Sequence, residues 1–539
     1  MVALSLLLWF QGSVIVWKYG PLDGRAIPWN MYWVYGAIDT SIWFLIIFWA
    51  IIKTSFFYKF AHTIAKALIL IQLLSVIVIF VQTPRDLFNT RSYIIDETSK
   101  FNFSKEKNVI LIVIDAYQSD IFQEIITQND NYRNIFNDFV YFRNALAPFS
   151  WTELSVPAIL TGKFYDNSVK RSVFLKNAFL DKSIPKVLKD NGFEVDLFPL
   201  KLWEYHEMYF DESICSNLKK RRNSIKVHFK EIKETLLLFD LALFRHLPHF
   251  TKKYIYNDNQ WFFYRLFPIY YRKLKKHFNM SKNEVYKDEK FEGDEFIDSA
   301  RSKHYFQTKN KVFKFYHLWG MHAPLVINEK SEIALQVEYN KENYTRQAKA
   351  YLESIKMFFE ILKQEGVYNN SLIFIIGDHG SGRSRDMYIN PVYDSHNAAL
   401  NQVSPNGNYD DLNQVSPEGN FQMYKARGIP LVLAKPFNSR EEFKISDAPV
   451  SLIDIPKTIM SELKIKTDFP GLSMFEVEDD YKRKRYYGAY YWFLKNKDFV
   501  DPITMYVVNG FSWSNESWNV LSILPPKIPS KFSGRKERN

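Results

Sequence analysis

Two long apolar runs in the chain each end at polar side chains that can bind a metal. Residues 108–114 (NVILIVI) lead into Asp115, and residues 371–377 (SLIFIIG) lead into Asp378 and His379. Strands buried on both faces of a parallel sheet are continuously apolar, so both runs predict central strands of an α/β sheet. Ligands bind at the carboxyl ends of such strands. We therefore expect Asp115, Asp378 and His379 to converge on one metal site.

From about residue 105 onward the chain alternates between strand-like and helix-like patterns. Short apolar runs recur, and an amphipathic helical pattern spans Tyr344–Gln364. The predicted strands are Asn108–Ile114, Phe139–Arg143, Glu194–Phe198, Val312–His317, Leu372–Ile376 and Pro430–Ala434. Alternation of this kind predicts a doubly wound α/β sandwich.

Three apolar segments near the N-terminus, residues 3–17, 38–57 and 67–82, predict about three transmembrane helices. The alternative for the last two is a pair of buried core helices, but the Trp and Tyr clusters beside them favour the membrane. The first segment is short and has no basic leader of the kind that precedes a signal peptide. One interpretation is that it is the end of a longer span.

Basic residues predict the orientation of these helices. The stretch between the second and third segments carries Lys53, Lys59 and Lys66 and no acid, so the positive-inside rule places it in the cytoplasm. The chain after Val81 then emerges outside. The expected layout is a transmembrane region at 1–84, a linker at 85–106, an extracytoplasmic α/β domain at 107–480 and a C-terminal extension at 481–539.

Composition adds three constraints. With 539 residues, of which 47% are hydrophobic, the chain can bury a sizeable core. Its single cysteine, Cys215, permits no intramolecular disulfide, so core packing and any bound metal must hold the domain together. A net charge of +11 favours an anionic membrane surface as a partner.

Residues 148–162 (PFSWTELSVPAILTG) resemble the alkaline phosphatase and sulfatase superfamily, whose nucleophile precedes a Leu-Thr-Gly by a fixed distance. Counting back nine residues from Thr161 gives Thr152 as the candidate nucleophile. Sulfatases instead use a cysteine, converted to formylglycine, within Cys-x-Pro-x-Arg. Cys215 stands in CSNLK, which argues against a formylglycine sulfatase.

The residues around Thr152 are similar to one branch of that superfamily. A Thr followed by Ser-Val-Pro, here at 155–157, resembles the membrane phosphoethanolamine transferases, and lipoteichoic acid synthases, which transfer phosphoglycerol, also use a Thr. The lack of disulfides favours the phosphoglycerol transferases. The resemblance covers about residues 107–475, and it implies a bacterial inner-membrane protein with its catalytic domain outside the cytoplasm.

The resemblance also implies a metal-activated nucleophile. Asp115, the Thr152 hydroxyl, Asp378 and His379 offer three oxygens and one nitrogen, a set that suits one tetrahedral Zn²⁺ and also accepts Mn²⁺. Metal coordination lowers the pKa of a hydroxyl, so Thr152 can attack phosphorus and form a phosphothreonine. No pattern for a second metal is found.

Three further histidines are candidates for the site. The motif at 313–324 (FKFYHLWGMHAP) resembles a strand of the family, and its His322 is the expected phosphate-binding residue and general acid. His396, 17 residues beyond His379, resembles a second substrate-site histidine. His317 is interpreted as a hydrogen-bonded core residue.

Residues 218–280 interleave aromatic and basic side chains. Such a segment suits the membrane interface. The alternative is an insertion that packs its rings on the domain and turns its charges to water, and the sequence leaves both open. A repeat at 401–409 and 413–421 predicts a loop, either a lid or a tolerated duplication. An outward-facing domain argues against nucleic acid as a partner.

The sequence therefore predicts a membrane-anchored transferase that moves a phospho-headgroup, phosphoethanolamine or phosphoglycerol, from a phospholipid donor to an extracytoplasmic glycan or glycolipid acceptor. The alternatives are a hydrolase of phosphate or sulfate esters and a catalytically silent regulator that binds lipid.

Overall fold

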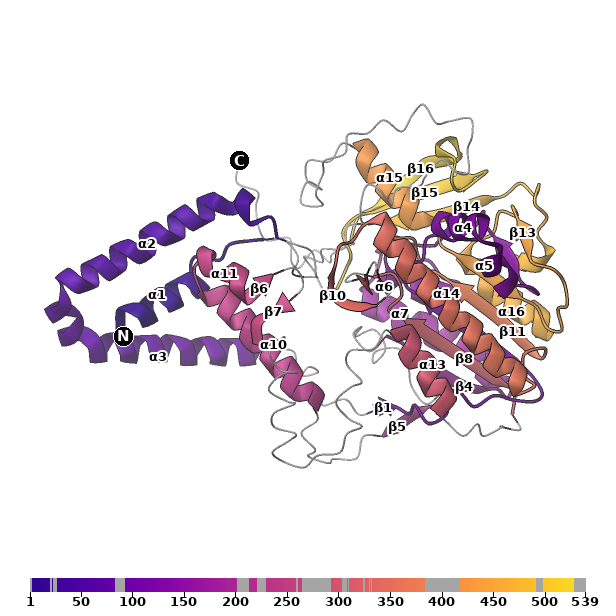
Figure 1. The fold of residues 1–539 in the computed structure, drawn as a ribbon, viewed down its shortest axis with the longest axis horizontal. Coiled ribbons are helices and arrows are strands. Elements are labelled where there is room, and N and C mark those ends of the chain that lie inside the picture. The colour runs from indigo at the N-terminus through magenta and orange to yellow at the C-terminus, as the bar shows by residue number, and fades with distance from the viewer. Residues whose placement is uncertain are drawn as a thin grey trace. The chain divides into compact units, whose positions relative to one another are not determined.

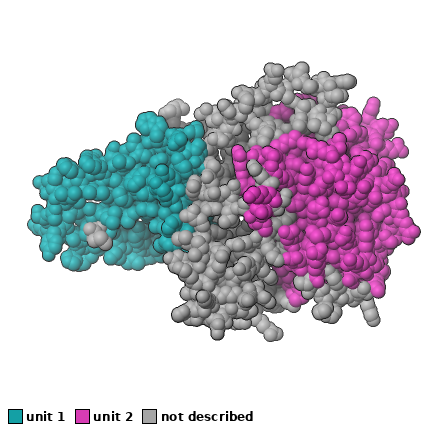
Figure 2. Space-filling model, viewed as in Figure 1, with its two compact units in different colours: residues 1–92, 221–289, 334–336 teal, residues 93–220, 290–333, 337–539 magenta. Residues whose placement is uncertain are grey.

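The computed structural model divides the chain into two compact units, which Figure 2 colours separately. Residues 1–92, 221–289 and 334–336 form the helical unit, and residues 93–220, 290–333 and 337–539 form the sheet unit. The structure describes all residues except 1, 20–21, 23–26, 83–92, 201–212, 221–228, 258–259, 264–291, 303–307, 309, 323–324, 329, 331, 383–416, 491–497 and 528–539.

A seven-stranded sheet in the order β13-β3-β12-β11-β2-β8-β4 organises the sheet unit. Its strands are β2 (Asn108–Ile114), β3 (Val140–Phe142), β4 (Glu194–Phe198), β8 (Val312–Leu318), β11 (Ser371–Ile376), β12 (Val432–Lys435) and β13 (Lys444–Ser446). From β11 to β4 all neighbours run parallel, whereas β12 is antiparallel to β11 and to β3. The predicted central strands, β2 and β11, are direct neighbours.

Alternation along β2 shows why its sequence is apolar throughout. Ile110, Ile112 and Ile114 belong to one hydrophobic core, and the intervening valines and Leu111 belong to the other. Both faces of the sheet are therefore buried under helices, which confirms the predicted α/β sandwich.

Helices cover the two faces of this sheet. On one face lie α4 (Ser119–Gln128), α5 (Asp130–Ile135), α13 (Glu292–Ser302) and α14 (Lys341–Gln364), with α13 beside α14 in Figure 1. On the other face lie α6 (Thr152–Thr161), α7 (Arg171–Asp181), α8 (Ile184–Asp190) and α16 (Ile455–Leu463). The helix predicted at Tyr344–Gln364 is confirmed and begins at Lys341.

Smaller elements complete the sheet unit. Paired short strands are β1 (Tyr93–Ile95) with β5 (Leu218–Lys220) and β9 (Leu325–Ile327) with β10 (Ile333–Val337), of which residues 334–336 are counted with the helical unit. Helix α15 spans Pro417–Gly428. The chain beyond residue 480, where no resemblance was found, forms an antiparallel sheet of β14 (Lys484–Ala489), β15 (Ile503–Asn509) and β16 (Trp518–Leu524).

The N-terminal segments of the helical unit are α1 (Val2–Ser13), α2 (Trp33–Ile52) and α3 (Thr54–Gln82). Of the three predicted spans, two are long and apolar enough to cross a membrane in the described chain, Trp29–Ile52 and Thr54–Val78, while α1 is shorter. The basic stretch predicted as a loop is mostly helical. Only Lys53 lies between α2 and α3, because the helical pattern resumes at once.

Apart from β5, which is in the sheet unit, the described part of the aromatic and basic segment belongs to the helical unit. It forms α10 (Phe229–His246), α11 (His249–Ile255), β6 (Tyr256–Asn257) and β7 (Gln260–Trp261). These elements share a hydrophobic core with Tyr19, Ile27 and Trp29, and α10 packs on α1 while α11 packs on α2. The segment is thus an insertion in sequence but part of the N-terminal helical unit in structure.

Candidate metal centre

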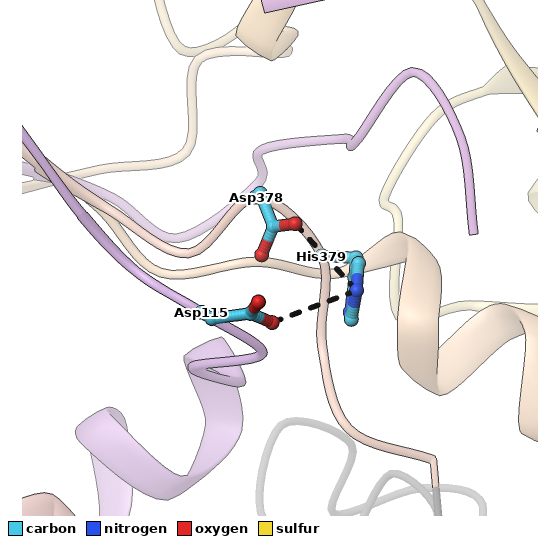
Figure 3. Close-up of side chains that lie close together, drawn as sticks. All are labelled: Asp115, Asp378 and His379. Atoms are coloured by element: carbon cyan, nitrogen blue, oxygen red, sulfur yellow. Dashed lines mark ion pairs between the residues drawn. The ribbon is translucent and has the colours of Figure 1, made fainter. Parts of the chain in front are cut away.

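Asp115, Asp378 and His379 converge at the carboxyl ends of β2 and β11, as Figure 3 shows. The two strands pair in parallel with Val113 opposite Ile376, so Asp115 and Asp378 each stand two residues beyond a matched pair. One ligand atom from each of the three side chains lies within 4.8 Å of the others. His379 Nε2 is 3.8 Å from Asp115 Oδ1 and 3.6 Å from Asp378 Oδ2.

The backbone after β2 turns sharply to allow this approach. Ala116 has a φ of +57°, and its N–H donates to Asp378 Oδ1 at 3.1 Å. Gly320 lies against the same turn, because a Cβ there would come within 2.4 Å of the backbone N and O of Asp115. Tyr344 from α14 donates to the Ala116 carbonyl at 2.6 Å. Contacts with Asp378, Gly320 and Tyr344 therefore hold this turn in place.

Thr152 is the first residue of α6 and reaches the same cluster. Its hydroxyl donates to Asp115 Oδ2 at 3.3 Å and lies 3.2 Å from His379 Nε2. The Ser155 hydroxyl, one turn further on, donates to the Asp378 carbonyl at 2.7 Å and ties α6 to the end of β11. A helix N-terminus carries partial positive charge, which stabilises an oxyanion at Thr152.

Helix α6 explains the spacing of the sequence motif. Gly162 ends the helix in the left-handed conformation, with a φ of +70°, and its N–H bonds to the Ala158 carbonyl. Proline 470 packs close to Gly162, since a Cβ there would lie 3.0 Å from its ring. The Leu-Thr-Gly thus marks the end of the helix that begins at Thr152.

The C-terminal sheet holds the segment that precedes α6. Gly488 of β14 donates to the Pro148 carbonyl at 2.9 Å and accepts from Ser150 N–H at 3.1 Å. The Trp151 indole donates to the Tyr490 carbonyl at 2.8 Å. Sequence reasoning missed this role because it depends on backbone pairing between distant segments, for which β14 has no motif.

Two buried carboxylate oxygens favour a bound cation. Asp115 Oδ1 and Asp378 Oδ2 accept no hydrogen bond from any described residue. Burial raises the pKa of Asp115 well above its ordinary value, and the Asp378 carboxylate raises it further, while Arg427 and the Thr152 hydroxyl act in the opposite direction. A divalent cation would satisfy both oxygens. The residues therefore fit the metal that the sequence predicts.

His379 is oriented for the same purpose. Its Nδ1 donates to the Gly380 carbonyl at 2.7 Å, so Nε2 carries the lone pair and points toward Thr152 and the carboxylates. A fixed tautomer of this kind is typical of metal-binding histidines. With oxygens from Asp115 and Asp378, the donor set suits Zn²⁺ or Mn²⁺.

His317 lies closer to the site than its sequence interpretation suggests. It is buried in β8 opposite Val113 of β2, and its Nε2 is 3.5 Å from Asp115 Oδ2. Burial lowers the pKa of His317 to about 4, against the opposing effect of Asp378, so the imidazole is neutral at pH 7. The sequence did contain a signal for this position. His317 stands at the carboxyl end of a predicted strand, and the same criterion identified Asp115 as a site residue.

A small pocket opens beside the cluster. It is lined by Ala116, Trp151, His322, Tyr339, His379, Ser381 and Arg427. The structure therefore places His322, the predicted phosphate-binding residue, in the same pocket as His379. His396 lies outside the described residues.

Arg427, near the end of α15, is the main residue that sequence reasoning missed. Its guanidinium lies 3.6 Å from the Trp151 ring centroid, donates to the carbonyls of Ser150 and Ser381, and reaches within 3.4 Å of His379 Nε2. It is only 2% exposed. No local pattern marks it, since it follows His379 by 48 residues. A buried guanidinium beside a metal cluster is suited to bind an anionic group.

An α/β sandwich with a hydroxyl, two carboxylates and a histidine at the strand ends agrees with an enzyme of the alkaline phosphatase superfamily, which includes sulfatases and phosphoester hydrolases or transferases. The chain belongs to the sulfatase family, whose model matches residues 107–465. No curated protein sequence matches it.

Several solved structures are similar in fold. The lipoteichoic acid synthase LtaP from Listeria monocytogenes is 12% identical, with 78% of this chain and 89% of that chain covered and a TM-score of 0.38. The phosphonate monoester hydrolase SpPMH from Silicibacter pomeroyi is 12% identical, with 76% and 87% covered and a TM-score of 0.39. Ps i-CgsB in complex with k-i-k-neocarrahexaose is 13% identical, with 77% and 86% covered and a TM-score of 0.42.

Proposed function

We propose that the protein is a membrane-anchored transferase that moves a phospho-headgroup from a phospholipid to a glycan or glycolipid outside the cytoplasm. The observation that carries this proposal is Thr152. A threonine hydroxyl stands among Asp115, Asp378 and His379, and no cysteine that could become formylglycine lies in the motif. The helices Trp29–Ile52 and Thr54–Val78 support a membrane location for the donor.

In the first half-reaction, Thr152 Oγ1 attacks the phosphorus of the headgroup as its alkoxide, after its proton has been lost to solvent. The bond from phosphorus to the diacylglycerol oxygen breaks as the bond to Thr152 forms, and His322 donates a proton to the departing oxygen. A divalent ion held by Asp115, Asp378 and His379 would lower the pKa of the Thr152 hydroxyl toward neutrality.

In the second half-reaction, an acceptor hydroxyl attacks the same phosphorus. It gives its proton to His322, and the bond between Thr152 and phosphorus breaks. Arg427 and the N-terminus of α6 stabilise the negative oxygens of the phosphoryl group in both steps. Exclusion of water from the pocket decides between transfer and hydrolysis. Hydrolysis of a phosphate ester at the same threonine is the second candidate, because the same first half-reaction serves it.

The test uses purified full-length protein and a phospholipid labelled in its headgroup. Mass spectrometry should find the label on Thr152, with diacylglycerol released, and then on an added glycolipid. Thr152→Ala should abolish both, with activity lower by about 10⁶-fold, the loss seen on removing a catalytic nucleophile. Thr152→Ser keeps a hydroxyl and should retain part of the activity.

Other outcomes distinguish the alternatives. Label released as free headgroup phosphate in the presence of acceptor would support the hydrolase. Full biological function of Thr152→Ala would support the catalytically silent regulator and contradict both enzymatic proposals.

We also propose that the sheet unit lies outside the cytoplasm. Lys53 forms the turn between the two candidate spans, and Lys59 and Lys66 follow in the first part of α3. A reporter fused after Phe57 should be cytoplasmic, and one fused after Ser92 should be exported. The reverse pattern would contradict this orientation.

A further inference from the structure

A buried carboxylate joins α11 to the N-terminal helices, and Arg245 and His246 of α10 bond to the Gly12 and Leu8 carbonyls of α1. Asp39 of α2 is fully buried, and its oxygens accept hydrogen bonds from Gln11 Nε2 at 3.1 Å, Trp17 Nε1 at 2.7 Å and the His249 backbone N–H at 2.7 Å. His249 is the first residue of α11, so the positive end of that helix faces the carboxylate. Three segments far apart in sequence thus meet at one side chain.

Aromatic packing surrounds this joint. The Tyr19 hydroxyl lies 2.8 Å from His249 Nδ1, and its ring packs edge-on against Phe244 of α10. The rings of Trp17 and Tyr35 stack with centroids 4.2 Å apart. Helices α10 and α11 are therefore a fixed part of the helical unit.

Large apolar side chains project from the outer surface of α10 and α11. Leu238 and Tyr254 are about two-thirds exposed, and Phe239 and Phe250 are about half exposed. Lys253 accompanies them, with its Nζ 5.1 Å from the Tyr254 ring centroid. Burial of these apolar side chains is favourable, and a cation beside them suits the boundary between acyl chains and headgroups, so this surface fits a membrane interface.

The position of Asp39 along α2 determines where along this helix α11 is attached. At about 1.5 Å per residue, Asp39 lies roughly 9 Å from the start of α2 at Trp33 and roughly 20 Å from its end at Ile52. Trp33 and Phe44, on either side of Asp39, are both more than 60% exposed. The elements joined to Asp39 therefore lie beside an apolar surface of a candidate span, near one of its ends.

We propose that α10 and α11 are part of the membrane anchor, lie in the interface of the bilayer, and place Leu238, Phe239, Phe250 and Tyr254 against its acyl chains. This inference rests on the membrane anchoring proposed above and is independent of the reaction at Thr152. It has a structural consequence: the chain passes between the two units after residues 92, 220, 289, 333 and 336, so several covalent connections, rather than one linker, join the sheet unit to the anchor.

The experiment uses full-length protein in liposomes of phosphatidylethanolamine and phosphatidylglycerol. Single variants Leu238→Cys and Phe250→Cys carry a bimane fluorophore. The native Cys215 is buried and does not compete for the label. Lipids with a quencher on the acyl chain should quench both labels as strongly as one at Phe44→Cys on α2. A label at Val520→Cys, on an exposed position of β16, should keep its fluorescence.

Each result decides a separate point. Labels at 238 and 250 that keep their fluorescence, as the Val520→Cys label does, would overturn the inference while Phe44→Cys remains quenched. An unquenched label at Phe44→Cys would instead overturn the membrane anchoring itself. The labelled proteins should keep the activity of the wild type, because the labelled positions lie outside the cluster around Thr152.

Discussion

Each unit of the protein buries an aspartate beside a histidine, but the two carboxylates have different partners. Asp39, in the helical unit, accepts three hydrogen bonds from nitrogen donors. Asp115, in the sheet unit, lies next to a second carboxylate, Asp378, and each has one oxygen that accepts no hydrogen bond from the described part of the chain. Both aspartates are inaccessible to solvent.

This difference distinguishes a structural cluster from a functional one. A buried carboxylate with enough donors holds segments together and needs nothing further. Two neighbouring carboxylates with unsatisfied oxygens repel each other, and they destabilise the fold unless a cation compensates. The cluster around Asp115 is therefore arranged for a ligand, whereas the cluster around Asp39 is complete within the helical unit.

The sharpest test of the comparison is Asp378→Asn. The substitution removes one of two repelling charges, so without metal the variant should unfold at the same temperature as the wild type or higher. Zn²⁺ at 100 times its Kd should stabilise the wild type by about 2.7 kcal/mol and should leave the variant unchanged. Activity should be lost. Thermal unfolding with and without Zn²⁺, together with metal analysis, measures both effects.

An exposed substitution, Asp190→Asn, provides the control for a change of charge alone and should respond to Zn²⁺ as the wild type does. Equal metal content in wild type and Asp378→Asn would show that the cation binds elsewhere.

The second test concerns Arg427, the cation already present beside the unsatisfied cluster. Arg427→Gln should lower kcat by about 10²–10³-fold, as for the loss of one donor to a transition-state oxyanion, while metal content stays the same. Arg427→Lys should recover only part of the rate, because lysine keeps the charge and loses the planar fork. Steady-state kinetics with the labelled phospholipid measures the change.

Lys425→Gln, on the same helix, is the matched control, since Lys425 bonds to the Trp513 carbonyl rather than to the pocket. A decrease in kcat as large for Lys425→Gln as for Arg427→Gln would point to general damage to α15.

The smallest effect is expected for a substitution of Asp39, whose oxygens already have hydrogen-bond donors. Asp39→Ala leaves three nitrogen donors without their acceptor and should destabilise the helical unit by about 2–3 kcal/mol. Unlike the effect at Asp378, this loss should be the same with Zn²⁺ and with chelator. Thermal unfolding and proteolysis between α10 and α11 measure it. A metal-dependent loss would contradict the division into two independent clusters.

The core of the sheet unit could be predicted from local patterns. The runs at 108–114 and 371–376 are apolar because both faces of β2 and β11 are buried, and the polar residues that follow them meet because parallel neighbours end at one edge. Thr152 was found from its resemblance-based spacing to Leu-Thr-Gly, and the structure shows that this spacing is the length of α6. His317 was placed in the core correctly, but its proximity to Asp115 depends on the pairing of β8 with β2.

Contacts between distant segments could not be predicted in this way. The support of Ser150 by Gly488 and the joint between Asp39 and His249, 210 residues apart, leave no periodic signal in the sequence. The basic stretch after Lys53 was interpreted as a loop because charge patterns do not reveal where a helix begins. The repeat at 401–421 was predicted as a loop, but its last residues, 417–421, form the start of α15. The rest of the repeat and His396 lie outside the described residues, so their roles remain predictions.

The hydrogen bond from Ala116 N–H to Asp378 joins residues 262 positions apart. This separation determines how late in translation the two residues can meet. At about 5–20 residues per second, a ribosome needs roughly 13–50 s to reach Asp378 after completing Ala116. During that interval β2 has no β11 beside it, and a newly made chain offers an unprotected apolar edge to its surroundings. Asp115 therefore lacks Asp378 and His379 until about 70% of the chain has been translated, so the cluster of these three residues can form only after that point.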